Sequence, residues 1–100
     1  MNRLIEEKRQ QLERICRQRH VRRMDLFGSA TGSGFDPAES DFDFLVAFQD
    51  LGKNADAYFG LLEHLEAVFQ RPVDLVVDSA IQNPYFRQAV DSTRTPIYEA

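Results

Sequence analysis

Residues 26–48 read LFGSATGSGFDPAESDFDFLVAF, and this stretch decides the fold. A predicted strand over residues 21–27 stops at Gly28-Ser29, and a glycine-containing loop follows. A second strand is predicted from Asp41 to Phe48, because its apolar residues alternate along the chain. Asp41 and Asp43 then share the opposite face of this strand. The stretch therefore predicts a Gly-Ser turn after one strand and two carboxylates at the start of the next.

The remainder of the chain continues this alternation of helices and strands. Apolar residues recur at helical spacing in the first segment and again after the second strand, whereas the VDLVV run is rich in β-branched residues. We predict an α/β protein with a single domain over residues 1–100. The further elements are helices at about residues 3–19, 58–69 and 84–90, a strand at 73–77, and a short strand or packed tail at 96–98.

Charge is distributed unevenly along the 100 residues, whose net charge is -4. Residues 1–23 carry eight basic and three acidic side chains, whereas residues 24–52 carry six acidic and no basic ones. The basic run is either the solvated face of an amphipathic helix or a grip for a nucleotide, an RNA or an acidic partner. Because the whole protein is acidic, we do not expect direct nucleic-acid binding.

Composition also excludes several classes of protein. No apolar run approaches the ~20 residues that a membrane helix needs, so we expect no membrane association. The single cysteine, Cys16, cannot form an internal disulfide, which suits a cytoplasmic protein. One cysteine and two distant histidines, His20 and His64, do not form a zinc site.

Three aspartates are the candidate chemical groups. Asp41 and Asp43 have α-carbons roughly 6.5 Å apart in an extended strand, and Asp74 lies in an apolar strand where an unpaired carboxylate is costly. If the two strands are neighbours, the three carboxylates converge. Hard oxygen ligands of this kind suit Mg²⁺ or Mn²⁺ and phosphate-ester chemistry. The turn at Gly28 and Ser29 would add backbone N–H groups and a hydroxyl for phosphates.

Each of these motifs has an ordinary explanation when it is taken alone. Asp-x-Asp occurs at solvated strand ends, Gly-Ser occurs in many turns, and Asp74 could be satisfied by a salt bridge. Their order along the chain indicates a metal and phosphate site far more specifically than any one motif does.

This order resembles the G-S…D-x-D signature of the polymerase-beta-like nucleotidyltransferase superfamily. With the C-terminal stretch QNPYFRQAVDSTRTPIYE, the whole chain looks like the minimal, single-domain branch of that superfamily, the MNT or MntA-like antitoxins. The resemblance implies a nucleotidyltransferase fold, in which a small mixed sheet is flanked by helices. It also implies that Gly28 and Ser29 hold the triphosphate of a nucleoside triphosphate.

The resemblance further implies roles for the acids and a partner. Asp41 and Asp43 would bind Mg²⁺, and Asp74 would complete the metal site and help to deprotonate the acceptor hydroxyl. The substrate would be ATP, and the acceptor a tyrosine of a HEPN-type toxin that is silenced by adenylylation. Since 100 residues leave little room for an acceptor pocket, we expect the acceptor to come from a partner and the protein to be an oligomer.

The sequence departs from the family pattern in its loop. Eleven residues, 30–40, separate Ser29 from Asp41, one more than is usual, and Ala30-Thr31-Gly32 stands where an arginine-containing segment is common. An alternative interpretation is therefore a nucleotidyltransferase-fold module that neutralises its partner by binding alone. Transfer to a small molecule is a third interpretation, but it needs a pocket that a second domain usually provides.

Overall fold

The computed structural model describes residues 2–32, 41–49 and 55–100. It contains a four-stranded sheet with the strand order β3-β2-β1-β4. Most of the glycine-containing loop, residues 33–40, and the polar turn predicted at 50–54 lie outside the described residues. The strands are β1 (Val21–Phe27), β2 (Phe42–Phe48), β3 (Val73–Val77) and β4 (Thr95–Glu99).

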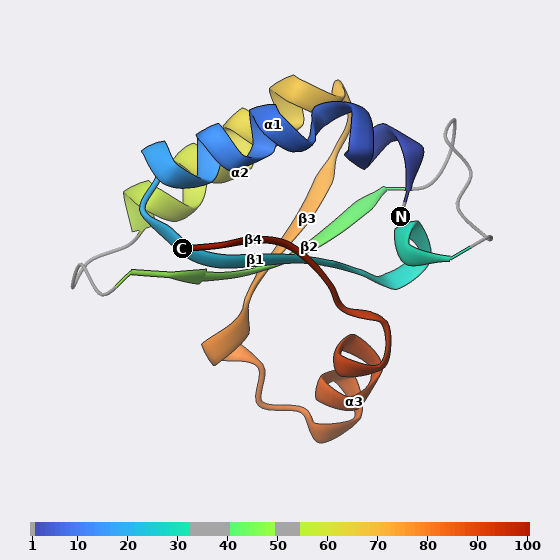
Figure 1. Ribbon diagram of the computed structural model, residues 1–100. Coiled ribbons are helices and arrows are strands. Elements are labelled where there is room, and N and C mark those ends of the chain that lie inside the picture. The colour runs from blue at the N-terminus through green and yellow to red at the C-terminus, as the bar shows by residue number, and fades with distance from the viewer. Residues whose placement is uncertain (1, 33–40, 50–54) are drawn as a thin grey trace.

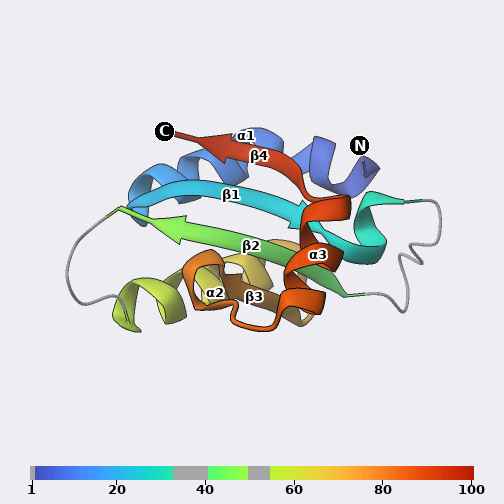
Figure 2. The ribbon, with the colours of Figure 1, turned by 90° about the horizontal axis from the view of Figure 1, so that it is seen from below.

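The sheet is mixed, as expected for the predicted α/β class. The central strand β1 pairs antiparallel with both β2 and β4, while β2 pairs parallel with β3. Two helices, α1 (Arg3–Gln18) and α2 (Ala55–Phe69), cover one face of the sheet, and α3 (Pro84–Thr93) lies on the other (Figure 1). Viewed from the α3 side, this short helix lies beside the turn that follows β1 (Figure 2).

Asparagine side chains begin two of the helices. The Oδ1 atom of Asn2 accepts hydrogen bonds from the N–H groups of Leu4 and Ile5, at 2.9 and 3.4 Å. Asn83 does the same for the first turn of α3, and Pro84 follows it at the first helical position, where its missing N–H costs nothing. Local sequence therefore determines where these helices begin.

The hydrophobic core has two parts, one on each face of the sheet. The larger part lies between the sheet and α1 and α2, and it includes Leu12, Phe44 and Leu61, all fully buried. The smaller part lies under α3, where Phe27, Leu45 and Val90 pack together. Because residues of β2 alternate between these two clusters, Asp43 and Leu45 share the face that α3 covers.

Two details differ from or extend the sequence prediction. Helix α3 continues to Thr93, beyond the predicted end near Val90, and Asp91 forms ion pairs with Arg87 and Arg94 at this end of the helix. Residues 95–99 form a true strand rather than a packed tail, since they pair with β1. Within the described ranges, no helix is both long and apolar enough to cross a membrane.

Candidate active site

The Gly-Ser turn follows directly from the end of β1, as the short 3-10 helix η1 (Gly28–Thr31). Gly28 has a φ of 75°, in the left-handed region that side-chain-bearing residues rarely adopt. A Cβ atom here would lie 2.5 Å from Oδ2 of Asp43. Only glycine therefore allows the turn to approach this carboxylate so closely. The next residue, Ser29, is exposed.

Two threonine hydroxyls hold the backbone of Gly28. Thr31 Oγ1 donates to the carbonyl oxygen of Gly28 at 2.7 Å, and Thr93 Oγ1 accepts from the N–H of Gly28 at 3.0 Å. Thr31 belongs to the turn itself, whereas Thr93 is the last residue of α3. The sequence pattern did not single out Thr93, because no local signal connects two residues so far apart along the chain.

Two of the three candidate acids lie side by side. Asp43 of β2 is directly opposite Asp74 of β3 in the parallel ladder. Neighbouring strands are about 4.8 Å apart, and residues in register point to the same face. The carboxyl groups therefore lie together on the α3 side of the sheet, with Asp43 half-buried and Asp74 exposed.

This pairing changes the acidity of Asp43. The pKa of Asp43 is raised to about 6, chiefly by burial and in addition by the neighbouring Asp74 carboxyl group and the negative charge of Asp41. Two carboxyl groups this close favour a shared proton or a cation that neutralises both. The pair is thus a site where positive charge is stabilised.

Asp41 lies just before β2 and is exposed. Its charge acts on Asp43, yet in the described part of the chain no three His, Cys, Asp or Glu side chains are gathered closely enough to hold a metal ion. The structure thus brings Asp43 and Asp74 together and leaves Asp41 at the edge of the pair. Carboxylate oxygens are the donors that Mg²⁺ and Mn²⁺ prefer, so the chemistry of the Asp43–Asp74 pair fits such a cation.

A cleft of about 510 Å³ opens beside the acid pair. The cleft is lined by Asp43 and Asp74 together with apolar side chains, among them Phe27 and Phe86. The Phe86 ring is 40% exposed and packs edge-to-face on Phe27, with 6.2 Å between the ring centroids. Phe86 is a cleft residue that the sequence analysis missed, although an aromatic side chain in the exposed first turn of a helix was a signal for it.

A second cleft, of about 580 Å³, lies at the other end of β2 and β3. Its lining includes Phe48, Arg22 and Asp78. The Asp78 carboxylate is already neutralised, since Arg87 lies 2.7 Å and Arg94 3.5 Å from its oxygens. The acids of the first cleft instead face each other, which makes the first cleft the better candidate for metal and phosphate chemistry.

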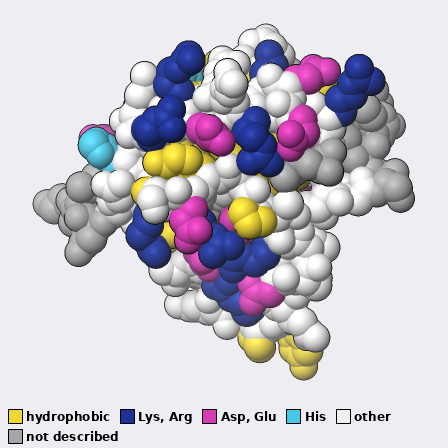
Figure 3. Space-filling model, viewed as in Figure 1, with side chains coloured by type: hydrophobic (Ala, Val, Ile, Leu, Met, Phe, Trp, Pro, Cys, Tyr) yellow, Lys and Arg dark blue, Asp and Glu magenta, His cyan; other side chains and the backbone are white. Residues whose placement is uncertain are grey.

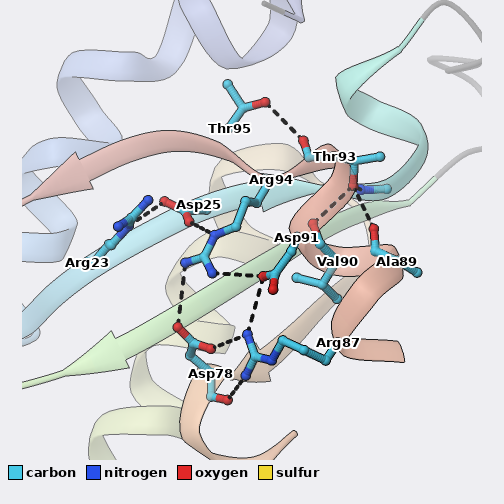
Figure 4. A network of polar contacts seen from close by, with 11 residues as sticks. Arg23, Asp25, Asp78, Arg87, Ala89, Val90, Asp91, Thr93, Arg94 and Thr95 are labelled. Atoms are coloured by element: carbon cyan, nitrogen blue, oxygen red, sulfur yellow. Dashed lines mark hydrogen bonds and ion pairs between the residues drawn. The ribbon is translucent and has the colours of Figure 1, made fainter. Parts of the chain in front are cut away.

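A network of ion pairs fixes α3 against this face of the sheet (Figure 4). One member is Asp25 of β1, which is fully buried. Its Oδ2 atom accepts from Nε of Arg94 at 2.6 Å, and its Oδ1 atom accepts from Nε of Arg23 at 3.1 Å. A buried carboxylate requires such partners, because removing it from water is otherwise costly. The network continues from Arg94 through Asp78, Arg87 and Asp91.

The basic N-terminal segment does not border the acid pair. Five of its eight basic residues belong to α1, which covers the opposite face of the sheet, and Lys and Arg side chains spread over the molecular surface there (Figure 3), whereas Arg22 and Arg23 belong to β1. Two of its arginines form ion pairs within the helix, Arg3 with Glu7 and Arg9 with Glu6. This arrangement fits the interpretation of the basic run as a solvated helix face.

Comparison with known proteins agrees with this geometry. The family model described as "Polymerase beta, Nucleotidyltransferase" matches residues 10–100. The matched range includes the Gly-Ser turn, all three candidate acids and α3. No curated protein matches the sequence of this chain.

Several solved structures share the fold. A candidate minimal nucleotidyltransferase is 27% identical, with a TM-score of 0.76 over 92% of this chain and 91% of that one. A chain from the complex of a tri-AMPylated Shewanella oneidensis HEPN toxin with its MNT antitoxin is 20% identical, with a TM-score of 0.67 over 95% and 72% of the two chains. A chain from a toxin–antitoxin structure with AMP-PNP is 22% identical, with a TM-score of 0.69 over 92% and 73%. The last two show likeness of fold alone.

Proposed function

Because this chain belongs to the polymerase beta nucleotidyltransferase family, we propose that it transfers AMP from ATP to a hydroxyl group of a partner protein. The observation that carries this proposal is the Asp43–Asp74 pair beside the Gly28-Ser29 turn. Structures of similar fold come from HEPN toxin–antitoxin complexes, one of them with a tri-AMPylated toxin. The acceptor is therefore a tyrosine of a HEPN-type toxin, and the chain acts as the antitoxin.

The site residues divide the work as follows. The turn formed by Gly28 and Ser29 holds the triphosphate, while Asp43 and Asp74, with Asp41 at their edge, would hold Mg²⁺ or Mn²⁺. When it is bound, the cation neutralises phosphate charge. The tyrosine oxygen forms a bond to the α-phosphorus, the bond to pyrophosphate breaks, and the phenolic proton passes to the Asp74 carboxylate and then to water. The products are AMP-tyrosine and pyrophosphate.

The openness of the site supports a protein acceptor. Asp74 and Ser29 are exposed, and Phe86 is partly so, which leaves the cleft reachable for a side chain presented by another protein. A complex with the partner is accordingly the working form.

A direct assay tests the proposal. The protein is incubated with α-labelled ATP, Mg²⁺ and the cognate toxin, and label on the toxin is expected. The double variant Asp41→Asn/Asp43→Asn should lose this labelling, whereas Asp56→Asn, an exposed aspartate on α2, should retain it. Label that persists undiminished in the double variant contradicts the assignment of the acids.

A second candidate is a module that neutralises its partner by binding alone. The observation that favours it is the absence of a basic residue in η1, so that this turn offers phosphates no cation. Calorimetric titration with Mg²⁺ and ATP separates the two functions. An enzyme binds the nucleotide in a metal-dependent way, whereas a module of the second kind protects against the toxin even without such binding.

A further inference from the structure

The hydroxyl of Thr93 links the end of α3 to the Gly-Ser turn. Its oxygen accepts from the N–H of Gly28 at 3.0 Å and lies 3.4 Å from the carbonyl oxygens of Ala89 and Val90, to which it can donate. A hydroxyl has one proton and two lone pairs, so both of its functions are used here. An N–H group has a single proton, and Gly28 cannot donate it fully to Thr93 and to a phosphate at the same time.

The helix that carries Thr93 is held firmly against β1. Arg94, the next residue, bonds to the buried Asp25 at 2.6 Å, and Val90 packs with Phe27 in the smaller core. Thr93 is therefore presented to Gly28 from a fixed position rather than from a free chain end. Thr31 holds the other side of the same residue through its carbonyl oxygen at 2.7 Å.

We infer that Thr93 is a positioning residue of the nucleotide-binding turn, which holds Gly28 in its left-handed conformation and leaves the phosphate contacts of the turn to Ser29. The two residues of the turn then have separate duties. Gly28 provides the close approach to Asp43, and the exposed Ser29 provides the hydroxyl and N–H for the ligand. This inference rests on the proposed nucleotide binding.

Substitutions at neighbouring hydroxyls provide the test. Thr93→Val removes the hydroxyl but keeps the shape of the side chain, and Thr93→Ser restores the hydroxyl. Thr93→Ala serves as a second hydroxyl-free variant with a higher helix propensity, in case the valine variant does not fold. Ser92→Ala is the matched control, because the Ser92 hydroxyl also donates to the carbonyl of Ala89, at 2.8 Å, and is exposed.

Two measurements are made on each variant: solvent exchange of the Gly28 amide by NMR without ligand, and ATP binding by calorimetry with Mg²⁺. The hydroxyl-free variants should show faster Gly28 exchange and about three- to tenfold weaker ATP binding, the size expected for one hydrogen bond. Thr93→Ser and Ser92→Ala should resemble the wild type in both. A merely structural residue would lower the melting temperature without changing ATP affinity in the folded protein.

The two measurements distinguish a failure of this inference from a failure of the proposed function. Unchanged Gly28 exchange in a folded hydroxyl-free variant overturns the inference, and so does unchanged ATP affinity when exchange is faster. If the wild-type protein binds no ATP with Mg²⁺, the proposed function fails, and with it the nucleotide role of Thr93. In that case the exchange rates still show whether Thr93 holds the turn.

Discussion

Asp43 of β2 lies directly opposite Asp74 of β3 in the parallel ladder, so two groups that would both be ionised in water lie side by side on adjacent strands. The arrangement is unfavourable at neutral pH without positive charge nearby, because like charges on adjacent strands repel. The pair therefore lowers the stability of the protein unless a cation or a proton neutralises it. The first predictions follow from this pair.

The metal-free protein should lose stability through Asp43 as the pH rises. The pKa of Asp43 is about 6 in the folded protein and near its ordinary value of 3.8 in the unfolded chain. The folded state therefore binds the proton more tightly, and this contribution is fully present below pH 3.8 and is lost as the pH rises through 6. Melting temperatures of the wild type and Asp43→Asn, measured without divalent ions, should diverge over this window. A difference that is constant from pH 4 to pH 7 contradicts the prediction.

Asp74→Asn should lower the pKa of Asp43 towards its ordinary value. The change removes one negative charge, but burial, the largest cause of the raised pKa, remains, so the shift is only partly reversed. The carboxyl carbon of Asp43 can be followed by NMR during a pH titration. Asp91→Asn, on α3 and outside the cleft, is the control and should leave the pKa of Asp43 unchanged. If Asp74→Asn also leaves the pKa of Asp43 unchanged, Asp74 does not influence Asp43 and the prediction is wrong.

Gly28→Ala should destabilise the fold by about 2 kcal/mol or more. A left-handed backbone costs a non-glycine residue about 1–3 kcal/mol, and the new Cβ would also displace the Asp43 carboxylate. Gly32→Ala is a matched control, because its φ is -124° and, apart from its chain neighbours, no group among the described residues lies within 4 Å of the added Cβ. Urea unfolding should show little change for Gly32→Ala. Equal effects at the two glycines would be inconsistent with the close approach at Gly28.

Arg94→Met should be among the more damaging substitutions outside the apolar core. It leaves Asp25 buried with only Arg23 beside it, and breaking a buried pair costs about 3–5 kcal/mol, with the lower end expected here because Arg23 remains. Arg3→Met is the comparison, since the Arg3 side chain is 93% exposed and its ion pair with Glu7 contributes about 0–1 kcal/mol. Denaturant unfolding of both variants measures the contrast.

The thiol of Cys16 should report global unfolding. Burial raises its pKa to about 12, and the side chain is fully buried, so the reactive thiolate is scarce and inaccessible in the folded protein. A thiol reagent should react slowly in buffer and rapidly in denaturant. Adding Ser92→Cys, at an exposed position, should produce a second, immediate phase of reaction in buffer. Fast labelling of Cys16 itself in buffer would contradict the buried placement.

Much of the fold could be predicted from periodicity. The strands of residues 21–27 and 73–77 have the predicted bounds, and the helix at residues 3–18 is one residue shorter than expected. The local sequence pattern did not determine the structure of the C-terminal segment, which depends on pairing between distant strands. Residues 95–99 become a strand only because β1 offers them a free edge, and no local signal distinguishes that outcome from a packed tail.

The site was only partly predictable for the same reason. Asp41 and Asp43 were predicted from their spacing within one strand, and Asp74 was predicted because it is an acid within an apolar run. The same signal was present at Asp25, which lies between Met24 and Leu26, but there it marks the anchor of α3. What Thr93 and Phe86 do depends on where α3 packs, and that position is determined by contacts across the whole chain.

The same long-range contacts have a consequence for how the protein is made. On the ribosome, Gly28 and Asp25 emerge long before their partners Thr93 and Arg94. A nascent chain that has exposed only β1 and β2 has the turn without its hydroxyl partner and a carboxylate without its arginine. Pulse proteolysis of nascent chains, stalled on an added C-terminal linker before and after residue 94 has left the ribosomal tunnel, should show a sharp gain in resistance between them. The turn at Gly28 therefore reaches its final, supported form only after α3 and Arg94 have been synthesised.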